Sequence, residues 1–253
     1  MKQNRYRGVI EIAWFNRHQY VAGTLVCLGA GWIWLRIPLP VIPCALLALG
    51  TGLAAFWLAA SLAASHYIYD RSGLSTWEWV KPLFPKPPTR WANIHCGFDE
   101  TTASLDRLFP RSERLVLDIF DAGEMTEASL QRARRCETRA PVAVRAQSAA
   151  LPARDEQMDA LFVLFAAHEL RHRFARSALF RELHRVLARD GRFLLVEHLR
   201  DGWNFLAFGP GYWHFLPRRE WVAQIREAGF TVEREFHKTP FVRAWLLRKE
   251  ARS

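Results

Sequence analysis

Two histidines and a glutamate follow the most apolar runs in the second half of the chain. His168 and Glu169 come directly after the run 158–167, and His198 closes the run that begins at Phe193. An imidazole has an ordinary pKa near neutrality, so it can take a proton from a reacting hydroxyl group. His168 is our first candidate for a catalytic base and His198 our second, although a histidine at a strand end can also be a capping or packing residue.

An aromatic segment with glycine hinges follows the second of these runs. Phe208, Tyr212 and His214 lie within or beside the sequence Gly209-Pro210-Gly211. Apolar walls with a few polar groups are typical of small-molecule pockets, so these three residues and Glu169 are the candidate substrate pocket. The alternative is that the aromatic side chains pack as a core or dock on the apolar N-terminal segment.

A glycine turn and an acidic residue lie upstream, at positions suited to a nucleotide-like ligand. Gly97 directly follows one apolar stretch, and Asp118 closes the next stretch about twenty residues later. In doubly wound α/β folds the glycine lets the backbone approach the ligand, and the acid binds ribose hydroxyls. Asp118 fits the acidic position, with Asp121 as the fallback.

These segments resemble, in order and spacing, the motifs of class I S-adenosylmethionine-dependent methyltransferases. Run 93–101 is similar to the first motif, 142–152 to the third strand and adenine loop, 158–170 to the fourth strand, and 180–198 to the following helix, glycine turn and fifth strand. The resemblance covers residues 92–248. It implies S-adenosylmethionine as cofactor and methyl transfer as the reaction. The cofactor-binding residues that it implies are Cys96, Gly97, Asp99, Asp118, Gln147, Ser148 and Phe165.

The chain departs from the family pattern in two places. Gly97 is the one glycine left in a turn that is usually richer in glycine, with Phe98 and Asp99 where small residues are expected. Gln147 stands where the family commonly has aspartate, although Asp99 can still accept a hydrogen bond from the cofactor's amino group. These departures leave open an alternative function: a catalytically inactive, methyltransferase-like membrane partner of a biosynthetic complex.

The order of elements predicts an α/β fold. Strand-like and helix-like runs alternate from residue 91 onwards, which is typical of a parallel sheet covered by helices. We expect strands over 92–96 and 115–119, helices over 102–108, 121–134 and 219–228, and a terminal antiparallel pair over 230–236 and 241–247. The predicted fold is a class I methyltransferase-like, doubly wound, mostly parallel sheet with a C-terminal antiparallel strand pair, preceded by an N-terminal two-helix membrane hairpin.

The hairpin is predicted from two apolar runs near the N-terminus. Arg36 is the one charged residue between positions 19 and 69, and Pro38, Pro40 and Pro43 break the chain between runs 21–35 and 37–69. Lysine and arginine flank both runs, so the positive-inside rule places both termini and the catalytic domain on the cytoplasmic side of the inner membrane. A re-entrant hairpin in one leaflet and two core helices of a soluble protein are the alternatives. Two long runs argue against a cleaved signal peptide.

The sequence divides into four predicted parts. They are an amphipathic interfacial helix over 1–19, the membrane hairpin over 20–69, a Pro/Trp-rich linker over 70–90 and the methyltransferase-like domain over 91–253. Apolar residues recur at helical spacing among arginines in the first part. The prolines of the linker exclude regular helix and sheet, and Trp77 and Trp79 are expected at the lipid headgroups.

Composition narrows the expected partners. The net charge of +10 suits a domain beside anionic lipids, and the chain has no nucleic-acid module signature. The basic residues expected to be solvated on helix faces are Arg132, Arg134, Arg135, Arg171 and Arg173. The four cysteines lack disulfide or metal spacing, so we expect a reduced protein without a metal site. The expected partners are membrane lipids and a lipophilic substrate (a lipid, quinone-like or polyketide-like compound) methylated on oxygen; protein partners are not predicted.

Overall fold

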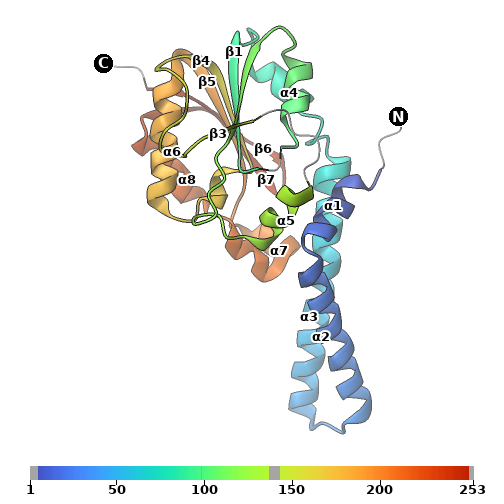
Figure 1. Cartoon of the computed structure of the whole chain (residues 1–253). Helices are drawn as coiled ribbons and strands as arrows, with labels where there is room; N and C mark the ends of the chain where they lie inside the picture. The colour runs from blue at the N-terminus through green and yellow to red at the C-terminus, as the bar shows by residue number, and fades with distance from the viewer. Residues whose placement is uncertain (1–4, 98, 137–142, 251–253) are drawn as a thin grey trace. The chain divides into compact units, whose positions relative to one another are not determined.

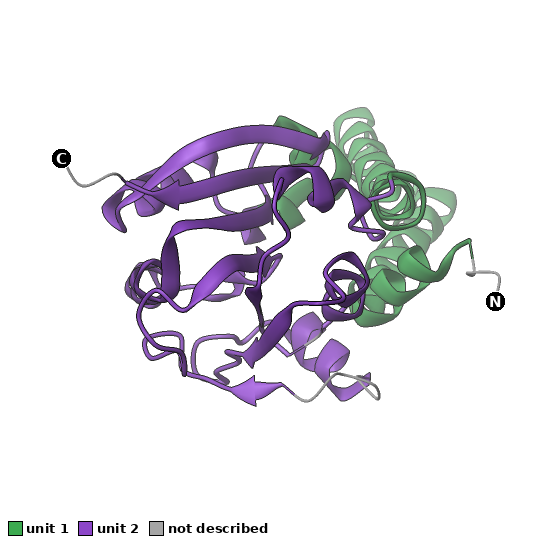
Figure 2. Cartoon of the chain, turned by 90° about the horizontal axis from the view of Figure 1, so that it is seen from above, with its two compact units in different colours: residues 1–72, 202–212 green, residues 73–201, 213–253 purple. Residues whose placement is uncertain are grey.

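The computed structural model describes residues 5–97, 99–136 and 143–250 (Figure 1). The chain divides into two compact units (Figure 2). A helical unit comprises residues 1–72 and 202–212, and a sheet unit comprises residues 73–201 and 213–253. Each unit is described by itself.

The helical unit is built on two long helices that lie side by side. Its elements are α1 (Arg7–Phe15), α2 (Arg17–Arg36), α3 (Val41–Ser65), the π-helical turn η1 (His66–Arg71), α7 (Gly202–Phe208) and the first part of the 3-10 helix η4 (Gly209–His214). A Cβ atom at Gly23 would lie 3.0 Å from the side chain of Leu58, so α2 and α3 approach closely there. Pro43 was expected between the helices but lies in the first turn of α3. Proline is tolerated there, because the N–H groups of the first turn have no acceptor within the helix.

One helix in the described part of the chain is long and apolar enough to cross a membrane. It is the continuous helix Val41–Arg71, which joins α3 to η1. The preceding helix α2 is shorter and carries Arg17 and Arg36 at its two ends. Both predicted helices therefore form, whereas length and composition mark only the second as a candidate span.

Helix α1 is fastened to the end of this long helix by Asp70. The carboxylate of Asp70 accepts hydrogen bonds from the backbone N–H groups of Gly8 at 2.7 Å and Val9 at 3.1 Å. The first amides of a helix have no acceptor within the helix, and a negative charge there is also stabilised by the positive end of the helix dipole. The ring of Tyr6 stacks on His66 at 5.0 Å. The amphipathic helix expected over 1–19 is thus a shorter helix held by the η1 turn.

The sheet unit contains seven strands in the order β3-β2-β1-β4-β5-β7-β6. The strands are β1 (Arg90–His95), β2 (Glu113–Asp118), β3 (Val144–Arg145), β4 (Met158–Leu164), β5 (Leu187–His198), β6 (Phe230–Thr239) and β7 (Val242–Lys249). Strands β1 to β5 are parallel, and β7 runs antiparallel to both β5 and β6. The predicted fold class is confirmed.

Helices cover both faces of this sheet. The helices of the unit are α4 (Thr102–Leu108), α5 (Ala128–Cys136), α6 (Arg173–Val186) and α8 (Arg218–Glu227). Leu161 and Val163 of β4 join one core with residues of α5, α6 and α8. Phe162 points to the other face, where its ring packs against Phe84, Trp91 and Phe109. Alternate residues of one strand therefore serve two cores, as the strand period of two requires.

Two expected elements are shorter in the structure. The helix expected over 121–134 begins only at Ala128, because Asp121 organises a turn before it: its carboxylate accepts a hydrogen bond from the N–H of Gly123 at 2.7 Å, and its carbonyl accepts one from Met125 at 2.8 Å. An aspartate that bonds nearby backbone in this way competes with helix formation. The third strand is limited to Val144–Arg145.

The segment before β1 belongs to the sheet unit, which corrects the expectation that its tryptophans lie among lipid headgroups. Trp77 is 3% exposed, and its ring lies 6.4 Å from Phe165. Trp79 packs edge-on against Phe236 at 5.9 Å. A 3-10 helix, η2 (Glu78–Leu83), forms here in spite of Pro82. These apolar side chains bury their surface against the sheet.

Replacing Trp77 with alanine tests this packing. Loss of a fully buried tryptophan costs about 3–5 kcal/mol, because it removes apolar contact and leaves a cavity. We expect that loss of unfolding free energy in chemical denaturation of the detergent-solubilised chain. Phe174→Ala is the control, because Phe174 lies in the same unit and is 90% exposed; its change should stay within about 0.5 kcal/mol. Equal effects of the two changes would contradict the packing.

Candidate functional site

The carboxyl ends of the parallel strands meet at one edge of the sheet. His95, Asp118, Leu164 and His198 are the last residues of β1, β2, β4 and β5. From β1 the chain winds outwards through β2 to β3 and then returns to β4 on the other side of β1. In open α/β sheets, ligands bind where the strand order reverses in this way.

The turn after β1 requires a glycine. Gly97 has a φ of +93°, a region that side chains with a Cβ rarely adopt. A Cβ atom there would lie 1.2 Å from Nη1 of Arg134. The N–H of Gly97 donates to Nδ1 of His95 at 2.9 Å, so the turn is closed by a residue of the strand itself.

Asp99 serves the helix that follows the turn. Its Oδ1 accepts hydrogen bonds from the backbone N–H groups of Thr101 at 3.0 Å and Thr102 at 2.9 Å. The side-chain amide of Asn93 also approaches this oxygen at 3.3 Å. These bonds satisfy the N-terminus of α4, the usual role of an aspartate before a helix. Phe98, the other departure from the family pattern, lies outside the described residues.

Asp118 is held by an arginine from α5. Nη1 of Arg134 lies 3.1 and 3.0 Å from the two carboxylate oxygens of Asp118, and it also donates to the carbonyl of Cys96 at 3.2 Å. The guanidinium lies over the ring of Phe120, 4.0 Å from its centroid. Arg134 was expected on a solvated helix face, and this expectation is wrong. The carboxylate of Asp118 and the carbonyl of Cys96 hold the guanidinium of Arg134 at the sheet edge instead.

This arrangement fits a ribose-bearing ligand. A carboxylate at the end of β2 and a left-handed glycine at the end of β1 are the two features that such a ligand needs. Arg134 bonds to both of them, to Asp118 through its oxygens and to the turn through the carbonyl of Cys96. The guanidinium therefore competes with ribose hydroxyls for Asp118.

The remaining predicted cofactor residues lie around this edge. Cys96 is buried, and burial, followed by the charge of Glu169, holds the pKa of its thiol well above the usual value. The thiol is therefore neutral and is no nucleophile. Gln147 is exposed after β3, and its backbone forms a bridge with Ala150. Ser148, beside it, is half-buried.

His168 is fixed by a buried carboxylate on the neighbouring strand. It lies in η3 (Ala167–Glu169), a single 3-10 turn after β4. Its Nδ1 is 2.6 Å from Oε2 of Glu197, which is 0% exposed on β5. Oε1 of Glu197 accepts the N–H groups of Ala167 at 3.0 Å and His168 at 3.3 Å. One carboxylate thus sets both the turn and the orientation of the imidazole ring.

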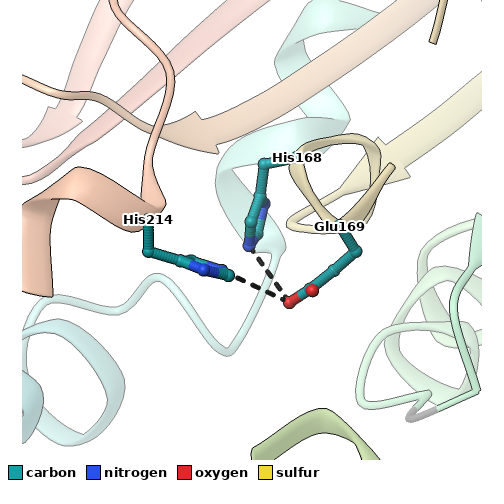
Figure 3. Close-up of side chains that lie close together, drawn as sticks. All are labelled: His168, Glu169 and His214. Carbon is teal, nitrogen blue, oxygen red and sulfur yellow. Dashed lines mark ion pairs between the residues drawn. The ribbon is translucent and has the colours of Figure 1, made fainter. Parts of the chain in front are cut away.

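Glu169 and His214 complete a cluster with His168 (Figure 3). Oε1 of Glu169 lies 3.4 Å from Nε2 of His168 and 3.6 Å from Nε2 of His214. The two imidazole rings are 5.1 Å apart and nearly perpendicular. Arg171 donates to the carbonyl of His214 at 2.7 Å, which holds that loop against the turn after β4. The structure brings these three predicted residues together.

Opposite charges decide the protonation of this cluster. Burial lowers the pKa of His168, but the carboxylates of Glu197 and Glu169 outweigh burial and raise it above its usual value. Burial raises the pKa of Glu169, but His168 and His214 outweigh burial and lower it. Glu169 is therefore a carboxylate, and the cluster favours a positive charge beside it.

His198 lies between aromatic rings at the end of β5. Its Nδ1–H donates to the carbonyl of Phe241 at 2.9 Å, which fixes the tautomer. The rings of Phe215 and Phe165 each lie 4.9 Å from the imidazole. Phe165 has a φ of +56°, a strained conformation for a bulky residue and one that is found at functional sites. His198 is thus a packed residue of the same edge.

Phe208 and Tyr212 belong to the helical unit. Within that unit the ring of Phe205 contacts Tyr212 at 5.0 Å and Trp57 of α3 at 5.5 Å. Gly209 has a φ of +53°, and a Cβ there would lie 2.6 Å from the ring of Trp57. Phe205 thus contacts both Trp57 and Tyr212 within the helical unit, and the assignment of Phe208 and Tyr212 to a substrate pocket stays a prediction.

Glu197 and Arg134 were not among the predicted site residues. Glu197 has a recognisable signal, since an acid inside an otherwise apolar strand must find partners when it is buried. Arg134 has none, because an arginine in a basic helix run is ordinarily solvated.

Arg134→Ala tests whether the guanidinium competes with the cofactor that the resemblance implies. Its removal frees Asp118 and opens the turn at Gly97, so S-adenosylmethionine should bind tighter by up to about 1 kcal/mol, roughly fivefold. Calorimetric titration of the solubilised chain measures this change. Arg135→Ala is the control, because Arg135 is exposed on the same helix and should leave the affinity unchanged. Weaker binding by Arg134→Ala would instead make Arg134 part of the cofactor site.

Comparison with known proteins agrees with the geometry. Residues 93–195 match a protein family described as "Methyltransferase domain". A SAM dependent methyltransferase from Aquifex aeolicus is similar in structure, with a TM-score of 0.52, 14% sequence identity, and coverage of 71% of this chain and 94% of that chain. The PH0226 protein from Pyrococcus horikoshii OT3 has a TM-score of 0.53 at 14% identity and covers 71% of this chain and 91% of its own. No curated protein sequence matches the chain.

A third structure was solved with ligands. It is the 1,6-didemethyltoxoflavin-N1-methyltransferase of Burkholderia thailandensis with bound 1,6-didemethyltoxoflavin and S-adenosylhomocysteine. Its TM-score is 0.52 at 15% identity, with coverage of 85% of this chain and 92% of that chain. The sheet order, the strand-end residues and the family match agree: residues 93–195 match a methyltransferase domain, and the sheet unit has the fold of class I methyltransferases.

Proposed function

We propose that the chain is anchored in a membrane and transfers the methyl group of S-adenosylmethionine to an oxygen atom of a lipophilic small molecule. The observation that carries this proposal is the buried pair of His168 and Glu197, 2.6 Å apart at the carboxyl ends of β4 and β5. Phe165 and His198 lie at the same strand ends.

The pair favours oxygen as the atom that is methylated. The cofactor supplies an activated methyl group, so the protein needs to hold the acceptor in line and, for a hydroxyl, to let its proton leave. An amine can attack before it loses a proton, whereas a hydroxyl oxygen is a poor nucleophile until it does. An imidazole oriented by a carboxylate, with Glu169 beside it, is suited to hold that hydroxyl. We therefore assign His168 the contact with the acceptor oxygen.

The helical unit supports a membrane location and a lipophilic acceptor. Its long helix Val41–Arg71 is apolar, and large apolar side chains on it and on α2 are exposed. The segment 202–212, which follows β5 in the chain, is part of this unit and packs on Trp57. Its own Trp203 and Leu206 are more than half exposed. Apolar surface of this kind is suited to lipid.

The flanking charges support a cytoplasmic domain. Lys2, Arg5 and Arg7 precede the helices, and Arg71, Lys81 and Lys86 follow them. Positive residues beside a span are retained on the cytoplasmic side.

His168→Asn tests the role in methyl transfer. We expect methylation of a lipid extract from the source organism to fall by about a hundredfold, because the acceptor oxygen loses its polar contact. The assay follows labelled methyl from S-adenosylmethionine into extractable product, and the affinity for the cofactor should stay unchanged. His172→Asn, an exposed histidine before α6, is the control and should keep full activity. A wild-type chain that binds the cofactor but methylates nothing in the extract would contradict the proposal.

Asp118→Ala tests the cofactor contact. Loss of a carboxylate that binds ribose hydroxyls should weaken S-adenosylmethionine by about 1.5–3 kcal/mol, roughly ten- to hundredfold. Asp121→Ala is the matched control, since Asp121 is an exposed aspartate three residues along the chain. A loss confined to Asp121→Ala would move the ribose contact to that residue. No binding by the folded wild-type chain would favour the inactive, partner-type alternative.

A further inference from the structure

We propose that His168, Glu169 and His214 bind a divalent transition-metal cation, with Zn²⁺ as the best match. All three residues belong to the sheet unit, and one ligand atom from each lies within 4.8 Å of the others. The cysteine spacing gave no reason to expect a metal. The cluster instead uses imidazole nitrogen and carboxylate oxygen, which are common zinc ligands.

The separations suit a tetrahedral cation. Zinc lies about 2.0–2.2 Å from nitrogen and oxygen ligands, so two ligands of a tetrahedron are about 3.4 Å apart. Oε1 of Glu169 is 3.4 Å from Nε2 of His168 and 3.6 Å from Nε2 of His214. Two of the three separations thus have nearly the value that a bound cation would impose, and the two imidazole nitrogens lie within 4.8 Å of each other. Three protein ligands leave the fourth position of a tetrahedron open, which is typical of catalytic zinc sites.

The partners behind His168 are those of a metal-binding histidine. A histidine that binds metal through one nitrogen usually donates its other N–H to a carboxylate or carbonyl, which fixes the ring and the tautomer. Nδ1 of His168 faces Glu197 at 2.6 Å, and Nε2 faces the cluster. The carboxylate of Glu197 is satisfied by this bond and by two backbone amides, so it orients His168 and is no ligand itself.

Glu169 provides a second observation. It is 7% exposed, and among the described residues its Oε2 is buried without a hydrogen-bond partner. A buried carboxylate oxygen without a partner costs free energy, because it has lost its water. A cation bound by both oxygens of the carboxylate would give Oε2 a partner and offset this cost.

His214 can present Nε2 to a cation when its other nitrogen carries the proton. Nδ1 lies 3.8 Å from the carboxylate of Glu127 and 3.3 Å from Nη1 of Arg171. A proton on Nδ1 would point to Glu127, while Arg171 keeps its shorter bond to the carbonyl of His214 at 2.7 Å. Binding of a cation therefore selects one tautomer of His214.

The open position gives the cation a chemical role, and this part of the inference rests on the proposed function. The hydroxyl oxygen of the acceptor would occupy the fourth position, where the cation lowers the pKa of that hydroxyl and its proton passes to water. The oxygen then forms a bond to the methyl carbon as the carbon–sulfur bond breaks, and the sulfur leaves with the electron pair. His168 would hold the acceptor through the cation. An acceptor with an acidic hydroxyl, such as a phenol or enol, fits this position best.

Direct binding of Zn²⁺ and Co²⁺ tests the site. The full chain, solubilised in detergent and freed of metal by a chelator, is titrated with Zn²⁺ against a chromogenic competitor. It is then titrated with Co²⁺, whose visible absorption reports tetrahedral geometry. We expect one Zn²⁺ per chain. Glu169→Gln and His214→Asn should each weaken binding at least tenfold, while His172→Asn should bind as the wild type does. Cofactor affinity and the thermal midpoint verify that each variant is folded.

Two results would overturn the site. A folded wild-type chain that takes up neither Zn²⁺ nor Co²⁺ has no such site, and equal affinity in wild type, Glu169→Gln and His214→Asn would place the metal elsewhere. A separate assay compares methyl transfer by metal-free and Zn²⁺-loaded chain. An unchanged rate with Zn²⁺ bound would refute the catalytic role and leave oxygen methylation standing. A loaded chain that binds cofactor but methylates nothing would refute the proposed function and leave the metal site standing.

Discussion

The candidate site depends on one buried carboxylate. Glu197 is fully buried near the carboxyl end of β5, and a buried carboxylate is costly unless hydrogen bonds replace its lost water. Its two oxygens accept the N–H groups of Ala167 and His168 and bond the imidazole of His168. The 3-10 helix after β4 folds around this carboxylate. The same helix places Glu169 at the ligand-binding edge of the sheet. The central strand thereby determines which side chains face the ligand.

The same constraint acts at the other strand ends. Asp118 on β2 is balanced by Arg134, and Glu169 is balanced by two imidazoles. At Asp118 and at Glu169 the protein therefore supplies its own cation. A ligand at Asp118 would replace a guanidinium by ribose hydroxyls, whereas a divalent cation at Glu169 would replace protons on the imidazoles. At both Asp118 and Glu169 a ligand would replace one hydrogen-bonding or charged partner by another, so the carboxylate would keep a partner throughout.

The sequence predicted the parts of the fold that local pattern determines. Alternating runs located the strands, and the helix expected over 102–108 has those bounds in the structure. The predictions were wrong where the structure depends on side-chain contacts that the local sequence pattern does not show. Asp121 bonds nearby backbone, so α5 begins later than expected. Trp77 packs against the sheet, where its apolar surface is buried. His168 and His214 were both predicted site residues, but their direct contact was not predictable, since they are far apart in the sequence and the segment between β5 and α8 has no repeating pattern.

The third member of the cluster is held by the sheet unit itself. His214 follows the segment that packs on the apolar helix, which suggests that the helices hold it in place. Two arginines argue otherwise. Arg171 donates to the carbonyl of His214 at 2.7 Å, and Arg200, just after β5, donates to the carbonyls of Phe215 at 2.8 Å and Trp213 at 2.9 Å. Three successive carbonyls are therefore tied to residues at the ends of β4 and β5. The cluster is therefore complete within the sheet unit.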